Sequence, residues 1–263
     1  MSILGGVSMD LIVAQGCRPL SDITWTVERV DREFNTILAL RREGPAGSSS
    51  DGKQVAAFTG ETVPLMALQM ELQGVVSSKE QLGSILNNLT LGVAPDTLSL
   101  QPKDFLIRPM SITQEGSLAV GEYVRVGQRI RFMIRDQQGA REDLQSHGIA
   151  YKKRQLVASL AGQGQEEPVG MMVFSCNGRG SSLYQEPSYD TRTVSSFIPV
   201  PCSGFLCNGE IGGLRGSTHL HGFTCVVGVI RAANQAPAPT PVEETIETKE
   251  AANKDITEFK RSE

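Results

Sequence analysis

The sequence predicts an α/β or α+β fold in which a mixed β-sheet and flanking helices form a layered domain. Apolar residues at every second position predict strands, most clearly at residues 129–134 and also at 105–109 and 118–120. Apolar residues at helical spacings predict two helices, around residues 64–68 and 81–86. Because hairpin-like and crossover segments occur in one chain, a mixed sheet is favoured.

The N-terminal part has short stretches of β character at residues 10–14, 24–30 and 36–40. Residues 41–54 then carry glycine, proline and a polar run without apolar periodicity. This composition predicts a flexible loop, and we place a domain boundary there.

A helix is expected after the strand at residues 129–134. Asp136 can cap it, and the helix includes Leu144. Glu142 and Asp143 lie near the same helix start, where negative charge is favourable. We therefore interpret all three carboxylates as capping residues rather than as acid/base groups.

The C-terminal part contains three further elements and a tail. The continuous apolar run at residues 169–174 predicts a central strand covered on both faces. A helix is expected at residues 189–197 and a closing strand at 223–230. From residue 232 the composition changes to Ala and Pro and then to Glu, Lys and Thr, so residues 232–263 are predicted to be a disordered tail.

Composition excludes several classes of function. The formal net charge of -4 and the 5% aromatic content argue against nucleic-acid binding. No stretch approaches the roughly 20 apolar residues of a membrane helix, so no membrane span is expected. Five dispersed cysteines indicate reduced thiols in an intracellular, cytoplasmic protein. A plastid is the alternative location if a targeting peptide precedes the chain.

Two strand-to-loop junctions repeat the sequence Cys-Asn-Gly. Glycine after each asparagine lets the backbone expose its amide groups, as a small polar ligand requires. Both loops follow apolar strands, so we expect them to face each other across one pocket. The candidate ligand-binding residues are Cys176, Asn177, Gly178, Arg179, Gly180, Cys207, Asn208, Gly209, Glu210 and His221.

Arg179 and Glu210 carry opposite charges on these two loops. Arg179 could fork onto a ligand carboxylate while Glu210 accepts from an ammonium group, which together would suit an amino acid. Alternatively, the two side chains pair with each other and lock the loops. Asn177 and Asn208 either bind the ligand or occupy turn positions.

Cys176 ends an apolar strand and lies close to Arg179 in sequence. A small core side chain is the favoured interpretation. The alternative is a reactive thiol whose pKa the arginine lowers, with His221 as its base in a thiol-dependent enzyme.

Two cysteines and two histidines fall in one short stretch: Cys202, Cys207, His219 and His221. Phe205 and Leu206 between the cysteines resemble core strand residues, whereas structural zinc generally uses tight knuckles. We therefore favour a hydrogen-bonded His221 and predict no metal. The chain shows no phosphate loop or dinucleotide fingerprint, so no cofactor is predicted.

Three segments in order carry a family resemblance: residues 174–180 (FSCNGRG), 203–212 (SGFLCNGEIG) and 220–224 (LHGFT). They resemble the C-terminal FIST domain, named for F-box and intracellular signal transduction proteins. Residues 131–144 look like this family's strand leading into a helix. The resemblance covers roughly residues 55–231, which we expect to form the FIST C-terminal domain.

Upstream, residues 15–19 (QGCRP) and 35–38 (NTIL) look like the end of an N-terminal FIST domain. Residues 1–40 are therefore expected to be a remnant of that domain.

The resemblance implies a noncatalytic sensory module that binds a small polar ligand, such as an amino acid, in intracellular signalling. An alternative is an interaction module that recruits substrates to an F-box-type ubiquitin ligase, since family members also occur beside F-box segments. The implied partners are a small polar ligand and a protein of signalling or ubiquitin ligation.

Overall fold

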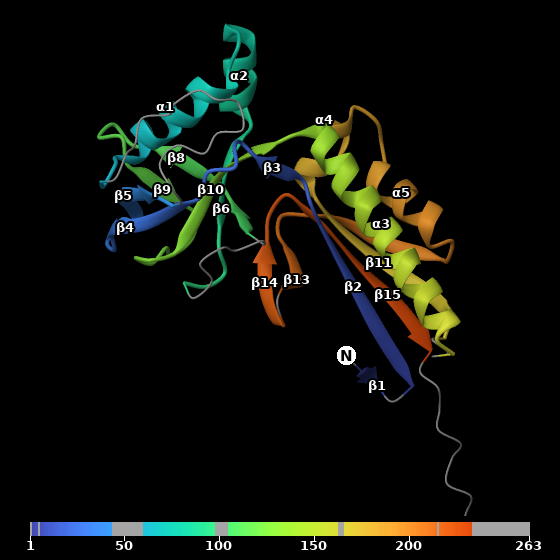
Figure 1. Cartoon of the computed structure of the whole chain (residues 1–263). Coiled ribbons are helices and arrows are strands. Elements are labelled where there is room, and N and C mark those ends of the chain that lie inside the picture. Colours follow the sequence, from blue (N-terminus) through green and yellow to red (C-terminus); the bar gives the residue numbers. More distant parts are fainter. Residues whose placement is uncertain are drawn as a thin grey trace, which may run out of the picture.

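The computed structural model describes residues 2–4, 6–43, 60–97, 105–162, 166–214 and 216–232. These residues form two principal β-sheets, a separate hairpin and five α-helices, which confirms the expected mixed α+β architecture (Figure 1). Among the described helices, none combines the length and apolar character needed to cross a membrane.

The first sheet has five strands in the order β1-β2-β15-β11-β12. Their bounds are Ser2–Leu4 (β1), Val7–Gln15 (β2), Thr224–Ala232 (β15), Pro168–Cys176 (β11) and Cys202–Cys207 (β12). β11 and β12 run parallel and the other pairs are antiparallel, so the sheet is mixed as predicted. The closing strand predicted at residues 223–230 is β15, and it lies in the middle of this sheet.

Helices α3 (Gln137–Leu160) and α5 (Tyr189–Phe197) cover one face of the first sheet (Figure 1). Leu144 of α3 and Val194 of α5 belong to one core cluster with Val173 of β11 and Val227 of β15. Asp136 caps α3 by accepting a hydrogen bond from Gly139 N at 3.0 Å, which confirms that prediction. A short 3-10 turn (Asn177–Arg179) and α4 (Ser181–Tyr184) connect β11 to α5.

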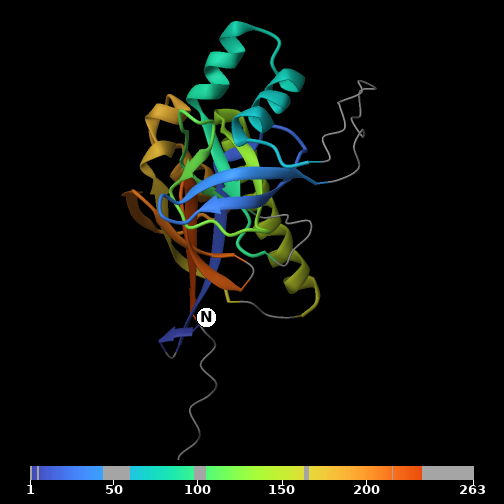
Figure 2. The ribbon, with the colours of Figure 1, turned by 90° about the vertical axis from the view of Figure 1, so that its left-hand side faces the viewer.

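The second sheet has the order β7-β6-β10-β4-β5-β9-β8, with β3 paired to β10. The bounds are Cys17–Pro19 (β3), Trp25–Asp31 (β4), Thr36–Arg42 (β5), Leu89–Val93 (β6), Leu106–Arg108 (β7), Met110–Ile112 (β8), Leu118–Val120 (β9) and Arg129–Arg135 (β10). Helix α1 (Pro64–Val75) packs on this sheet and α2 (Lys79–Asn87) follows it, close to the two predicted helices. Figure 2 shows α1 and α2 at one end of the molecule, whereas β2 and β15 run toward the other.

A hairpin of β13 (Glu210–Leu214) and β14 (Ser217–His221) packs against β2 and β15. Gly212 of this hairpin faces Val13, which points away from α3 because its neighbours Ile12 and Ala14 belong to the α3 core. The hairpin therefore covers part of the second face of the first sheet.

Two expectations about strand burial are wrong. Residues 169–174 of β11 were expected to be covered on both faces, but Val169 is 56% exposed and Met172 is 37% exposed. Phe205 and Leu206 of β12 are exposed as well, at 64% and 56%, rather than part of the core. The reason is position: β12 is the edge strand, and the helices cover only one face of the sheet.

The N-terminal segment contributes strands to both sheets, because β2 pairs with β15 along its length while β4 and β5 belong to the second sheet. The division at residues 40 and 41 stays a prediction. Arg41 and Arg42 lie in β5, whereas residues 44–54 of the predicted loop lie outside the described residues. Of the predicted tail, Ala232 ends β15, and residues 233–263 lie outside the described residues.

Candidate functional site

Both Cys-Asn-Gly loops begin at the carboxyl ends of neighbouring strands of the first sheet. β11 and β12 are parallel neighbours in which Cys176 lies opposite Cys207. The carboxyl ends of parallel neighbours lie at the same end of the sheet, so the loops that follow start side by side. Asn177 and Asn208 are exposed there, and Gly209 has a positive φ of 139° that favours glycine.

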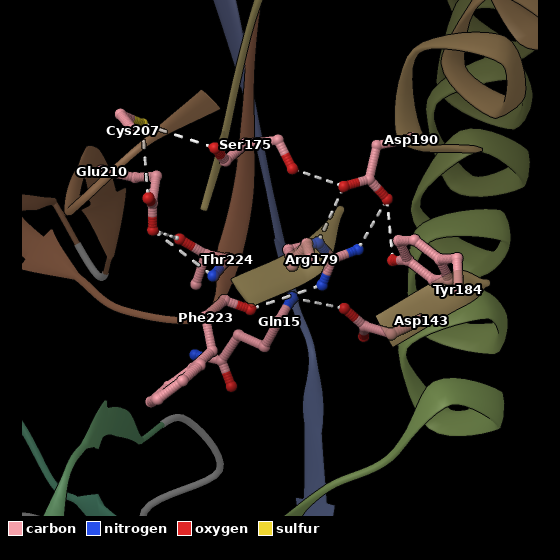
Figure 3. A network of polar contacts seen from close by, with 10 residues as sticks. All are labelled: Gln15, Asp143, Ser175, Arg179, Tyr184, Asp190, Cys207, Glu210, Phe223 and Thr224. Carbon is pink, nitrogen blue, oxygen red and sulfur yellow. Dashed lines mark hydrogen bonds and ion pairs between the residues drawn. The ribbon is translucent and has the colours of Figure 1, made fainter. Parts of the chain in front are cut away.

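Arg179 is fully buried and forks onto a carboxylate of α5. Its Nε lies 2.9 Å from Asp190 Oδ2 and its Nη2 lies 3.0 Å from Asp190 Oδ1. Asp190 also accepts hydrogen bonds from Ser175 Oγ at 2.5 Å and from Tyr184 Oη at 2.8 Å (Figure 3). We call these four residues the Asp190 cluster.

The Asp190 cluster keeps its arginine charged. Burial alone would lower the pKa of Arg179, but the hydrogen bonds and the charge of Asp190 outweigh it and raise that pKa. Burial raises the pKa of Tyr184, so its hydroxyl stays protonated as a donor to Asp190. The buried charges are thus balanced within the cluster.

Gly16 makes room for this arginine. A Cβ added at Gly16 would lie 2.8 Å from Arg179 Nη1 and 2.7 Å from Phe223 O. The Gly16 N–H donates to that same carbonyl at 3.0 Å, and Arg179 Nη1 lies 3.4 Å from it. The QGCRP segment of the sequence is therefore tied to the loop after β11.

Glu210 belongs to a different set of contacts. It is buried and accepts from Cys207 Sγ at 3.3 Å, from Gly209 N at 3.3 Å and from Thr224 Oγ1 at 2.8 Å. The expected alternative in which Arg179 pairs with Glu210 is therefore wrong, because Arg179 pairs with Asp190.

Ser175 stands between the two sets. Its carbonyl oxygen accepts from Cys207 Sγ at 3.6 Å, while its hydroxyl donates to Asp190 (Figure 3). Contacts thus run from the second Cys-Asn-Gly loop through β11 to the buried arginine of the first.

The cysteines differ in exposure. Cys176 and Cys225 are buried, whereas Cys202 is exposed on β12. Burial, together with the Glu210 carboxylate, raises the pKa of the Cys207 thiol to about 11. Burial also raises the pKa of Cys225, so both of these thiols are protonated and weakly nucleophilic at neutral pH.

His221 is buried at the end of β14. Its Nε2 lies 3.3 Å from Gly212 O, and its Nδ1 has no hydrogen-bond partner within the described part of the chain. Burial lowers its pKa, so the ring is neutral at physiological pH. In the described residues no hydrogen bond joins His221 to Cys176.

The four metal-ligand candidates do not converge among the residues that the structure describes, which contain no group of three or more suitable side chains. Cys202 is exposed at the start of β12, and the His219 and His221 rings are 6.4 Å apart on β14.

A cleft of about 570 Å³ lies beside the Asp190 cluster. It is lined by Val173 and Ser175 of β11, residues 179–181, residues 187–191 and residues 202–206. We call it the β12 cleft. Of the ten candidate residues, Arg179 and Gly180 line it, and the other eight do not belong to its lining.

Sequence reasoning missed Asp190, Ser175 and Tyr184, which hold Arg179. Asp190 lies in the first turn of a predicted helix, where a negative charge has a local explanation. Asp143 was expected to be a capping residue, but its Oδ2 accepts a hydrogen bond from Gln15 N of β2 at 2.6 Å (Figure 3). The partners of all four side chains depend on how α3, α4 and α5 pack.

Comparisons with known proteins identify one family. Residues 65–213 match the FIST C domain. Uncharacterized protein Rv0628c of Mycobacterium tuberculosis strain H37Rv is 29% identical over 226 residues, which cover 84% of this chain and 50% of that protein. Uncharacterized protein Mb0898c of Mycobacterium bovis is 28% identical over 218 residues, 81% of this chain and 48% of that protein. The chain spans about half the length of these curated relatives.

Proposed function

Because the chain belongs to the FIST C domain family, we propose that it is a noncatalytic binding module that holds a small polar ligand in the β12 cleft. The observation that carries this proposal is the cleft itself. Its volume of about 570 Å³ falls within the range of small-molecule sites. The wider role, which the family resemblance implies, is that of a sensory module in intracellular signalling.

The lining of the β12 cleft supports a polar ligand. The hydroxyl-bearing residues Ser181, Ser188 and Thr191 line it, together with the apolar residues Phe205 and Leu206. Such a combination of apolar surface with a few polar groups is typical of sites that orient a ligand. The Asp190 cluster holds the adjoining floor rigid through four hydrogen bonds.

The charges favour an uncharged ligand over a free amino acid. Arg179 and Asp190 are the ionised side chains that line the cleft, and they neutralise each other. A zwitterion would lose hydration at both ends without meeting an unpaired partner. This refines the expectation that Arg179 forks onto a ligand carboxylate.

The thiol contacts support binding over catalysis. A thiol-dependent enzyme needs a base within hydrogen-bond reach of its nucleophile. His221 instead contacts Gly212 O, and Cys176 is buried at the end of β11.

Cys202 offers a direct test, because it is exposed and lines the cleft. The probes are alanine and N-acetylalaninamide, which share a side chain but differ in charge. We expect N-acetylalaninamide at millimolar concentration to slow alkylation of Cys202 by iodoacetamide, mapped by mass spectrometry, and to raise the melting temperature. Alanine should do neither.

Matched variants on α5 make the test specific. Thr191→Trp places a large side chain at the cleft and should abolish the protection of Cys202. Ser196→Trp adds the same side chain at an exposed position outside the cleft lining and should leave it intact. The proposal fails if N-acetylalaninamide does not protect Cys202, or if protection persists in Thr191→Trp.

A further inference from the structure

β12 has an open edge. It is the last strand of the first sheet, and in the described part of the chain it pairs with β11 alone. Met171 N donates to Pro201 O, so Pro201 and every second residue after it direct their backbone groups toward β11. The N–H and C=O groups of Cys202, Gly204 and Leu206 therefore point off the edge, and all three residues are exposed.

The β12 cleft runs along this edge. Successive side chains of a strand alternate between the two faces of the sheet, so a cavity on one face meets every second residue. This cleft is lined by all five residues from 202 to 206. Val173 and Ser175 of β11 also line it, so the cleft lies on the face of the sheet that α5 covers and extends along β12, the last strand, with residues 179–181 and 187–191 as its other wall. Five strand residues offer roughly 16 Å of backbone.

The chemistry of the cleft matches a polypeptide main chain. Unpaired N–H and C=O groups alternate along the edge, and a free strand edge is a template for another strand. A Cβ added at Gly204 would lie 1.8 Å from Val173 O, so only glycine fits at the middle of β12. Because Arg179 and Asp190 satisfy each other, the lining offers no unpaired charge to a charged ligand.

We propose that the β12 cleft binds an extended, uncharged peptide segment, which pairs with β12 as an added strand of the first sheet. The main chain of the segment bonds to Cys202, Gly204 and Leu206, which gives affinity. Its side chains lie beside Phe205 and Leu206 on the two faces of the sheet, so apolar side chains are preferred. This inference rests on the proposed function, because it names the ligand class of the same cleft.

The probe is a pool of acetylated and amidated heptapeptides built from Val, Ile, Thr, Ser and Phe. A selected peptide should slow hydrogen exchange of the Cys202, Gly204 and Leu206 amides by roughly tenfold near saturation. Thr191→Trp should lose the peptide and Ser196→Trp should keep it. A pool without a binder, or a binder that leaves these amides unprotected, would overturn the proposal.

N-methylation of the peptide tests strand pairing on the unaltered protein. Methyl groups on the alternate amides that face β12 should abolish binding, whereas methyl groups on the intervening amides should leave it unchanged. Equal affinity of the two methylated series would refute the added strand. So would a dimer, detected by light scattering, that protects the same amides without peptide, because the occupant would then be a second copy.

The two proposals fail separately. If N-acetylalaninamide protects Cys202 but no heptapeptide binds, the peptide inference is wrong and the small-ligand site stands. If neither protects Cys202, both are wrong.

Discussion

A buried carboxylate lies beside each of the two sheets. One of them, Asp190, is paired with a guanidinium group, and the other, Glu71, is not paired with one in the described part of the chain. Asp190 beside the first sheet accepts from a serine hydroxyl, a tyrosine hydroxyl and Arg179. Glu71 of α1, beside the second sheet, accepts from Ser21 Oγ at 2.5 Å and from Trp25 Nε1 at 2.6 Å. Both carboxylates are almost completely buried, at 5% and 2% exposure.

The difference shows what a paired charge does for a buried acid. At Glu71 the burial dominates over the hydrogen bonds from Ser21 and Trp25 and over the charges of Arg42 and Arg131, and it raises the pKa to about 7. Asp190 instead has a partner that forks onto both of its oxygens. The carboxylate beside the cleft thus has a guanidinium partner that stays charged, whereas the carboxyl group of Glu71 exchanges a proton near neutral pH.

The largest effect is expected from Arg179→Ala. It leaves the Asp190 carboxylate buried without its cation, which typically costs about 3 to 5 kcal/mol. Urea denaturation at pH 7 should show this loss in the free energy of unfolding. The arginine therefore stabilises the fold, in contrast to a ligand-binding arginine whose removal leaves folding intact.

The matched control is Arg192→Ala. Arg192 pairs with Glu186 on the surface, where its side chain is 60% exposed, and such pairs contribute less than about 1 kcal/mol. If Arg179→Ala cost no more than this control, the contrast between a paired and an unpaired carboxylate would collapse.

The second prediction concerns pH. Since the pKa of Glu71 is raised from 4.5 to about 7 in the folded chain, the folded state holds this proton more tightly than the unfolded state. Its contribution to stability is complete below pH 4.5 and is lost as pH rises to about 7, a change of roughly 3 kcal/mol. Glu71→Gln should remove this part of the pH dependence.

Urea denaturation at several pH values between 4.5 and 8 measures the effect. Glu80→Gln on the exposed start of α2 is the control and should leave the profile unchanged. A Glu71→Gln profile parallel to that of the parent protein would show that Glu71 titrates normally.

The sequence predicted contacts that depend on near neighbours and missed those that depend on packing. Asp136 caps α3 through Gly139, three residues away, so local spacing was enough. For Arg179 the sequence offered Glu210 as the partner, whereas the packing of α5 brings Asp190 to it.

The apolar pattern of the sequence likewise predicts strands but not how they pack. It marked the residues before Cys207 as a strand, and β12 is there. Periodicity does not tell an edge strand from a central one, so the exposure of Phe205 and Leu206 and the cleft beside them could not be foreseen.

The smallest effect comes from one substitution made in both sites, Ser175→Ala and Ser21→Ala. Each removes a hydroxyl that donates to the buried carboxylate at 2.5 Å, a loss of about 1 kcal/mol. Beside Asp190 the cost should depend less on pH, because the fork from Arg179, which stays charged at both pH 5 and pH 8, persists without the serine. At Glu71 the hydroxyl stabilises the ionised form, so its removal raises the pKa further and costs more at pH 8 than at pH 5. The free energies of unfolding of both variants, measured at pH 5 and pH 8, test this difference. An equal pH dependence of the two serine substitutions would mean that the guanidinium group is not what separates the two sites.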